Sequence, residues 1–166
     1  MTNQEIIEFA ARRANEYRQR WLVMTKKKDG FGFHCSESSI RAINDALNMN
    51  IPEDVIRIST GFRGGGGGYG DRCGILESGI ILLGFKYGRL KKEEDCTKIS
   101  YLVRLLHVRY MEKLGSIYCR ILFPFHRLHS KDDSCAYVYD MGTKIVAELL
   151  LEAEDLLLEM PRNEVC

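Results

Sequence analysis

Residues 73–87 read CGILESGIILLGFKY, a stretch that is apolar over almost its whole length. About fifteen residues are too many for a typical buried strand, so the stretch favours a buried helix, even though its three glycines weaken helix propensity. Directly before it, residues 61–70 read GFRGGGGGYG, and five consecutive glycines suit neither a helix nor a strand. The sequence therefore predicts a Gly-rich loop that leads into a central buried helix.

The segments on both sides of this helix also carry helical patterns. Residues 2–24 are amphipathic and open with Thr2 and Glu5 at capping-box spacing. Further helices are expected over residues 36–47, 52–58, 99–114 and 135–159, with a shorter element over residues 116–123 that stops at Pro124. No run of alternating strands and no internal repeat is apparent. We predict an all-α, single-domain helical bundle of six to seven helices over residues 1–166, with an N-terminal amphipathic helix in residues 1–30 and the core in residues 31–160.

Composition excludes several classes of protein. The chain has 24 Lys and Arg against 23 Asp and Glu, and this balance argues against a nucleic-acid-binding protein. No stretch has the roughly 18 consecutive apolar residues of a membrane span. The N-terminus has no apolar segment of the kind found in secretory signals, so we expect a cytoplasmic protein. In such a reducing compartment, six cysteines are expected to bind metal, to carry out redox chemistry or to be buried and inert.

The cysteines divide by their local setting. Cys35, Cys73 and Cys135 each lie at the expected start of a helix, where unpaired N–H groups and the helix dipole favour a thiolate. Cys119 lies in the short element that follows Gly115. Cys96 and Cys166 have no such setting, and we expect them to be incidental.

Five segments of the chain, in order, resemble a known family. They are residues 34–42 (HCSESSIRA), 61–65 (GFRGG), 73–89 (CGILESGIILLGFKYGR), 119–122 (CRIL) and Cys135. Their order and spacing resemble the C-GCAxxG-C-C family, whose name records a cysteine pattern and a presumption of redox activity. The chain departs from the pattern at Ile75 and Ser78, where the family has Ala and Gly. Gly79, one position later, is expected to take over the close helix packing.

The resemblance extends to the iron–sulfur part of split-Soret cytochromes, although the haem-attachment motif C-x-x-C-H is absent here. It implies a redox protein in which Cys35, Cys73, Cys119 and Cys135 bind an iron–sulfur cluster of unknown nuclearity, for electron transfer or redox sensing. Residues 31–160 would then form a four-cysteine redox core.

Two other functions stay open at this point. The same cysteines could exchange thiols and disulfides without any cofactor, although no C-x-x-C pair is present. They could also hold structural zinc, or the chain could be a cofactor-free interaction module. Enzyme activity, the redox partner and the oligomeric state, a homodimer included, are likewise open.

The glycine loop has two interpretations. Its N–H groups could bind an anion beside Arg63 or Arg72, or its glycines could simply permit close approach of other parts of the chain. His34, His126 and His129 are not assigned to a metal.

Overall fold

The computed structural model describes residues 1–25, 33–129 and 135–161, with the side chains of residues 19–25 outside that description. Within these ranges it contains α-helices and one 3₁₀ helix, and no strand. The all-α prediction is confirmed. The elements, in chain order, are α1 (Asn3–Thr25), α2 (Cys35–Leu47), α3 (Glu53–Ile58), η1 (Ser59–Phe62), α4 (Gly74–Tyr87), α5 (Thr97–Leu114), α6 (Cys119–Leu128) and α7 (Ala136–Leu158).

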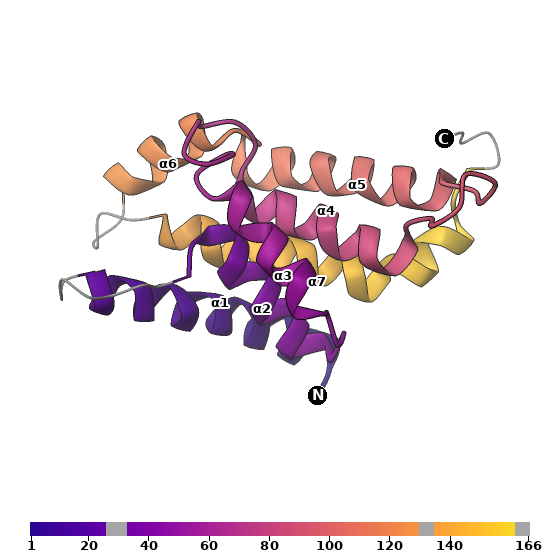
Figure 1. The fold of residues 1–166 in the computed structure, drawn as a ribbon, viewed down its shortest axis with the longest axis horizontal. Helices are drawn as coiled ribbons and strands as arrows, with labels where there is room; N and C mark the ends of the chain where they lie inside the picture. Colours follow the sequence, from indigo (N-terminus) through magenta and orange to yellow (C-terminus); the bar gives the residue numbers. More distant parts are fainter. Residues whose placement is uncertain (26–32, 130–134, 162–166) are drawn as a thin grey trace.

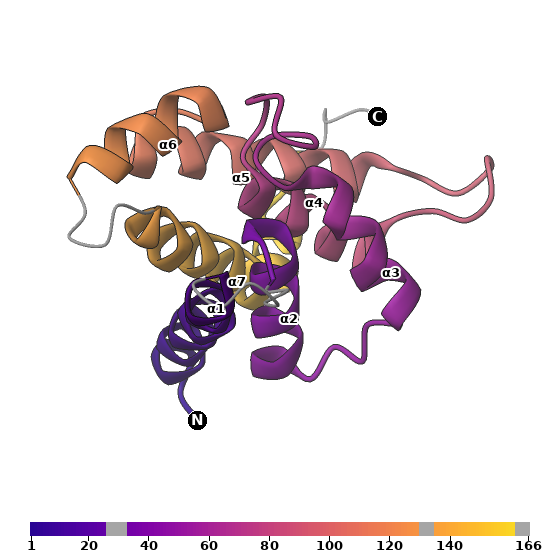
Figure 2. The same ribbon diagram turned by 60° about the vertical axis from the view of Figure 1, so that its left-hand side comes forward.

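The long helices form three tiers (Figures 1 and 2). Helices α4 and α7 occupy the middle, α5 packs on one side of them, and α1 and α2 pack on the other. Helix α6 lies at one end of the bundle, beside the loop between η1 and α4. None of the described helices combines the length and apolar character needed to cross a bilayer.

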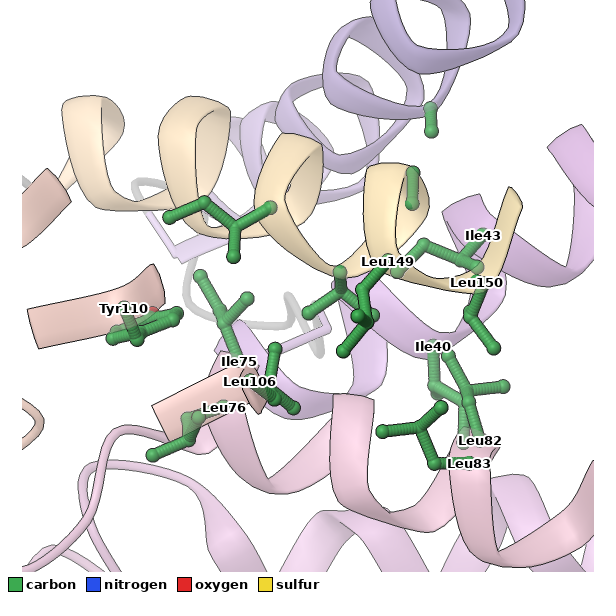
Figure 3. Packing of buried hydrophobic residues seen from close by; sticks show 14 of the residues in the cluster. Ile40, Ile43, Ile75, Leu76, Leu82, Leu83, Leu106, Tyr110, Leu149 and Leu150 are labelled. Carbon is green, nitrogen blue, oxygen red and sulfur yellow. The ribbon is translucent and has the colours of Figure 1, made fainter. Parts of the chain in front are cut away.

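Helix α4 is the central buried helix that the sequence predicts. Its side chains Ile75, Leu76, Leu82 and Leu83 are fully buried. Figure 3 shows them packed among buried side chains that come from three other helices: Ile40 and Ile43 of α2, Leu106 and Tyr110 of α5, and Leu149 and Leu150 of α7. Because apolar side chains surround α4, its burial contributes a large share of the hydrophobic stabilisation of the fold.

Gly79 allows α4 to approach its neighbours closely, as expected from its position one residue after Ser78. A Cβ atom at Gly79 would lie 2.8 Å from Cγ2 of Val146 in α7 and 2.9 Å from Cδ2 of Leu106 in α5. Ser78 is itself buried, and its hydroxyl donates to the carbonyl of Ile75 at 2.7 Å.

Helix boundaries agree with the sequence to within about two residues, except at both ends of α6. The capping box at the start of α1 is present, since Thr2 N donates to Glu5 Oε2 at 2.7 Å and Glu5 N donates to Thr2 Oγ1 at 3.3 Å. The prediction that the short element stops at Pro124 is wrong, because α6 continues through Pro124 to Leu128. Pro124 is exposed, so water can bond the carbonyl that its missing N–H leaves unpaired. Residues 26–30, the end of the predicted N-terminal segment, lie outside the described residues, and so do residues 130–134 before Cys135.

Candidate functional site

All four cysteines of the predicted site lie at helix starts. Cys35 and Cys119 are the first residues of α2 and α6, and Cys73 and Cys135 are the N-caps of α4 and α7. All four are free thiols. The sequence predicted this setting for three of them. The helix start at Cys119 was missed, because the element containing it was expected to begin at residue 116.

The four thiols line one cavity of about 800 Å³. Its wall combines segments that are far apart in the sequence: α1, the glycine loop, and the beginnings of α2, α4, α6 and α7. The structure thus brings together all four residues that the sequence singled out. Cys73 is buried, whereas Cys35, Cys119 and Cys135 are half-buried.

A short antiparallel pairing fixes Cys73 and Cys119 relative to each other. Cys73 N donates to the carbonyl of Ile117 at 2.7 Å, and Cys119 N donates to the carbonyl of Asp71 at 2.7 Å. Arg72 and Tyr118, the residues between these bonds, form an isolated bridge. The segment that enters α4 and the segment that enters α6 are therefore held in one register.

Gly74 places Cys35 against the start of α4. A Cβ atom at Gly74 would lie 2.7 Å from Cys35 Sγ and 2.8 Å from the carbonyl oxygen of Phe62. Any larger residue would displace the sulfur or the backbone of η1. The glycine that follows Cys73 is thus required by the close approach of a second cysteine.

The glycine loop folds as a left-handed turn that only glycine adopts readily. Residues 64–68 all have positive φ, from 58° to 93°. The N–H groups of residues 66–71 donate to carbonyls of residues 61–66, within the loop itself. Arg72 is also occupied, since its Nε lies 2.6 Å from Glu77 Oε1. An anion site made by the loop N–H groups is therefore not supported, and the close-approach interpretation holds.

Hydrogen-bond donors surround the two innermost sulfurs. The backbone N–H groups of Gly64 and Ser36 donate to the Cys35 sulfur. The Cys73 sulfur accepts from the buried hydroxyl of Tyr110 at 3.2 Å and from the N–H groups at the start of α4. Nothing in the sequence pointed to Tyr110, because it lies on the apolar face of α5, far from any cysteine along the chain.

The expectation that helix starts favour thiolates is wrong for this site. Burial, and then the nearby Cys73 thiol, raise the pKa of Cys35 to about 11, and the N–H donors offset only part of that rise. Burial also raises the pKa of Cys73, Cys119 and Cys135, and the neighbouring cysteines add to the rise in each. Removal from water and mutual repulsion between thiolates outweigh the helix dipole here.

Comparison with known proteins gives one family. A family model described as "Putative redox-active protein (C_GCAxxG_C_C)" matches residues 33–149, well over half of the chain. The chain belongs to this family. The matched residues include all four cysteines of the cavity, whereas α1 lies before them. No curated protein and no solved structure matches the chain significantly.

Helix α1, which precedes the matched residues of this family member, also contributes to the cavity. Arg18 of α1 is only 5% exposed and lines the cavity. Its positive charge lowers the pKa of Cys135, although by less than burial raises it. Nothing in the sequence marks Arg18, because an arginine on an amphipathic helix normally faces solvent.

The cysteines surround a volume rather than a point. Among the described residues, no group of three or more His, Cys, Asp and Glu side chains is placed so that it could hold a metal ion. Structural zinc needs four ligands at once, with thiolates about 2.3 Å from the ion. That arrangement is not seen among the described residues. The four thiols line a largely apolar cavity, and hydrogen-bond donors contact the sulfurs of Cys35 and Cys73.

The remaining cysteines are separate from this site. Cys96 is the N-cap of α5, at the opposite end of that helix from Gly115. It is disulfide-bonded, so the expectation that Cys96 is incidental is wrong. The 18 residues of α5 span about 27 Å at 1.5 Å per residue. Cys166 lies outside the described residues.

Proposed function

We propose that this member of the family is a redox protein that binds an iron–sulfur cluster through Cys35, Cys73, Cys119 and Cys135. The observation that carries the proposal is the convergence of four free thiols, from the starts of four helices, on one cavity. Four cysteine thiolates are the usual ligand set of both two-iron and four-iron clusters. When bound, such a group supplies one-electron redox chemistry, as electron transfer or redox sensing requires.

The surrounding residues suit this function. The donors to the Cys35 and Cys73 sulfurs would spread the negative charge of the thiolates, which raises the reduction potential of a bound cluster. The buried side chains of Ile75, Leu122 and Val138 line the cavity and make its inner wall apolar. Burial raises the pKa of these thiols, so iron would have to displace their protons on binding, and its positive charge would then offset the repulsion between the thiolates.

The test is reconstitution with iron and sulfide under anaerobic conditions. The protein is expected to gain charge-transfer absorbance in the visible range, with stoichiometric iron and sulfide. Cys119→Ser, at a half-buried position, should lower the iron content without unfolding the chain. Arg57→Ala is the control, since it changes an exposed side chain that does not line the cavity and should leave iron uptake unchanged. Wild-type protein that stays colourless and free of iron would overturn the proposal.

Thiol–disulfide exchange is the second candidate, and the contact at Gly74 favours it. Cys35 Sγ lies against Gly74, the residue next to Cys73, so these two thiols are a pair to consider. Oxidation would join the two sulfurs and release two protons, with two electrons passing to an oxidised partner. Thiol trapping followed by mass mapping separates the candidates. A reversible bond between Cys35 and Cys73 favours exchange, whereas four equally protected thiols in iron-loaded protein favour the cluster.

A further inference from the structure

The cysteine cavity is larger than the proposed cluster requires. If each of the eight atoms of a four-iron cluster occupied roughly the 30 Å³ that a water molecule takes in the liquid, the cluster would fill about 240 Å³. The cavity measures about 800 Å³. More than half of it would then stay available, a space within the range of about 300–1,000 Å³ found for small-molecule pockets.

The formally charged side chains that line this cavity are all basic. Arg63 of the glycine loop, Arg120 of α6 and Arg18 of α1 line it, and no described Asp or Glu does. Arg63 and Arg120 form no ion pair with any carboxylate in the part of the chain that the structure describes. Two guanidinium groups at one cavity are thus available to an anion. Planar guanidinium groups bind carboxylates, phosphates and sulfonates through paired hydrogen bonds.

These two arginines lie at the exposed side of the cavity together with aromatic rings. Arg63 and Arg120 are both exposed, and the lining residues Tyr69 and Phe123 are 84% and 42% exposed. Arg120 is held beside the glycine loop, because its backbone N–H donates to the carbonyl of Gly70 at 3.0 Å. The buried side of the cavity, in contrast, carries Cys73, Ile75 and Val138. A molecule that enters meets positive charge and aromatic faces first and the buried Cys73 thiol last.

We propose that the cavity binds a small aromatic organic anion, with its acidic group on Arg63 and Arg120 and its ring between Tyr69 and Phe123. The aromatic walls favour a flat, conjugated ligand, and the basic entrance favours a negative one. This inference deepens the proposed function, because it names the class of substrate or electron carrier that reaches the thiols. It rests on the proposed function for the redox role of the ligand, whereas the binding itself depends only on the cavity.

The test uses a matched pair of ligands and a matched pair of variants. Naphthalene-2-sulfonate is the anionic probe, and naphthalene-2-sulfonamide has the same ring without the charge. Binding is followed by calorimetry on the full chain. The double variant Arg63→Ala, Arg120→Ala is compared with Arg57→Ala, which removes an exposed arginine that pairs with Asp54 and does not line the cavity.

The sulfonate is expected to bind with one molecule per chain, and the double variant should weaken that binding about tenfold or more. Arg57→Ala should bind the sulfonate as the wild type does, and the sulfonamide should bind all variants equally. Equal sulfonate affinity in the wild type and the double variant would overturn the inference. So would an equal loss of sulfonamide affinity, because the arginines would then act through packing and not through charge.

Iron and sulfide are measured on the same samples, so that the two proposals can fail separately. Arginine-dependent binding of the sulfonate by protein that takes up no iron would refute the cluster and support the anion site. Iron-loaded protein that binds the sulfonate equally well with and without the two arginines would support the cluster and refute the anion site. All three arginines are exposed, and unchanged far-UV circular dichroism of the variants checks that they fold.

Discussion

Gly74→Ala places a methyl group into the tightest contact of the cysteine site. The new Cβ atom would lie 2.7 Å from Cys35 Sγ, 2.8 Å from the carbonyl oxygen of Phe62 and 3.3 Å from Cβ of Ser36. Cys35 Sγ can move only by rotation about one bond, Phe62 O belongs to the backbone, and Ser36 Cβ is attached directly to it. The chain must therefore shift at the start of α2 or at η1, and such overpacking costs about 1–3 kcal/mol.

Gly84→Ala, in the same helix, is the matched control. A Cβ atom at Gly84 would meet nothing within 4 Å. Alanine there should stabilise the protein by about 0.4–1 kcal/mol through helix propensity and a less flexible unfolded chain. Comparing the two alanine variants largely cancels that gain and leaves the overpacking cost at Gly74. A difference of about 2 kcal/mol corresponds to roughly 4–8 °C in Tm for a chain of this size.

The assay is urea unfolding of reduced, metal-free protein, with both variants measured against the wild type. Gly74→Ala should unfold at a lower urea concentration than Gly84→Ala with the same dependence on urea. It should also take up less iron on reconstitution, because Cys35 is displaced, whereas Gly84→Ala should load as the wild type does. Coincident midpoints for the two variants would refute the close approach of Cys35 to α4.

Two further predictions concern the thiols themselves. Tyr110→Phe keeps the buried ring but removes the hydroxyl that donates to Cys73. The reduction potential of a bound cluster should therefore fall in a redox titration, while the iron content stays unchanged. An unaltered potential would contradict the role of this bond. The second prediction concerns pH. Burial raises the pKa of Cys35 from 9.0 to about 11, so the folded metal-free protein holds that proton more tightly than the unfolded chain. Stability is therefore lost as the pH rises above 9. Cys35 alone should contribute a loss of about 1.4 kcal/mol in unfolding free energy between pH 7 and pH 10. This loss is measured as the part of the pH-dependent change that Cys35→Ser abolishes. Identical pH dependence in both proteins would contradict the raised pKa.

The helices of this fold follow closely from local sequence. The apolar run after the glycine loop predicts α4, because no polar residue marks a solvent-facing side along most of it. Gly115 likewise predicts the end of α5, where it has a left-handed φ of 74°. Pro124 shows the limit of such signals. A proline normally ends a helix, but at an exposed position water can satisfy the freed carbonyl and the helix continues.

The candidate site is only partly predictable. The cysteine pattern identifies the four thiols, and the sequence marks a helix start at three of them, but not at Cys119. The convergence of the thiols depends on long-range packing, and so does the effect of burial on their pKa values, which reverses the expected influence of the helix dipole. Arg18 lies on the amphipathic helix α1, and Tyr110 lies on the apolar face of α5. An arginine and a tyrosine are common at such positions, so neither residue indicates a function in the sequence.

The spacing of the four cysteines along the chain has a consequence for folding. Cys35, Cys73, Cys119 and Cys135 are separated by intervals of sixteen to several tens of residues, and each begins a different helix. A group bonded to all four sulfurs would close these intervals into loops. In the chain-entropy view of cross-links, closing a loop of fifteen residues or more removes roughly 3–4 kcal/mol of entropy from the unfolded state. The bound group would thus act as a multiple cross-link, and its loss would loosen the ends of four helices together.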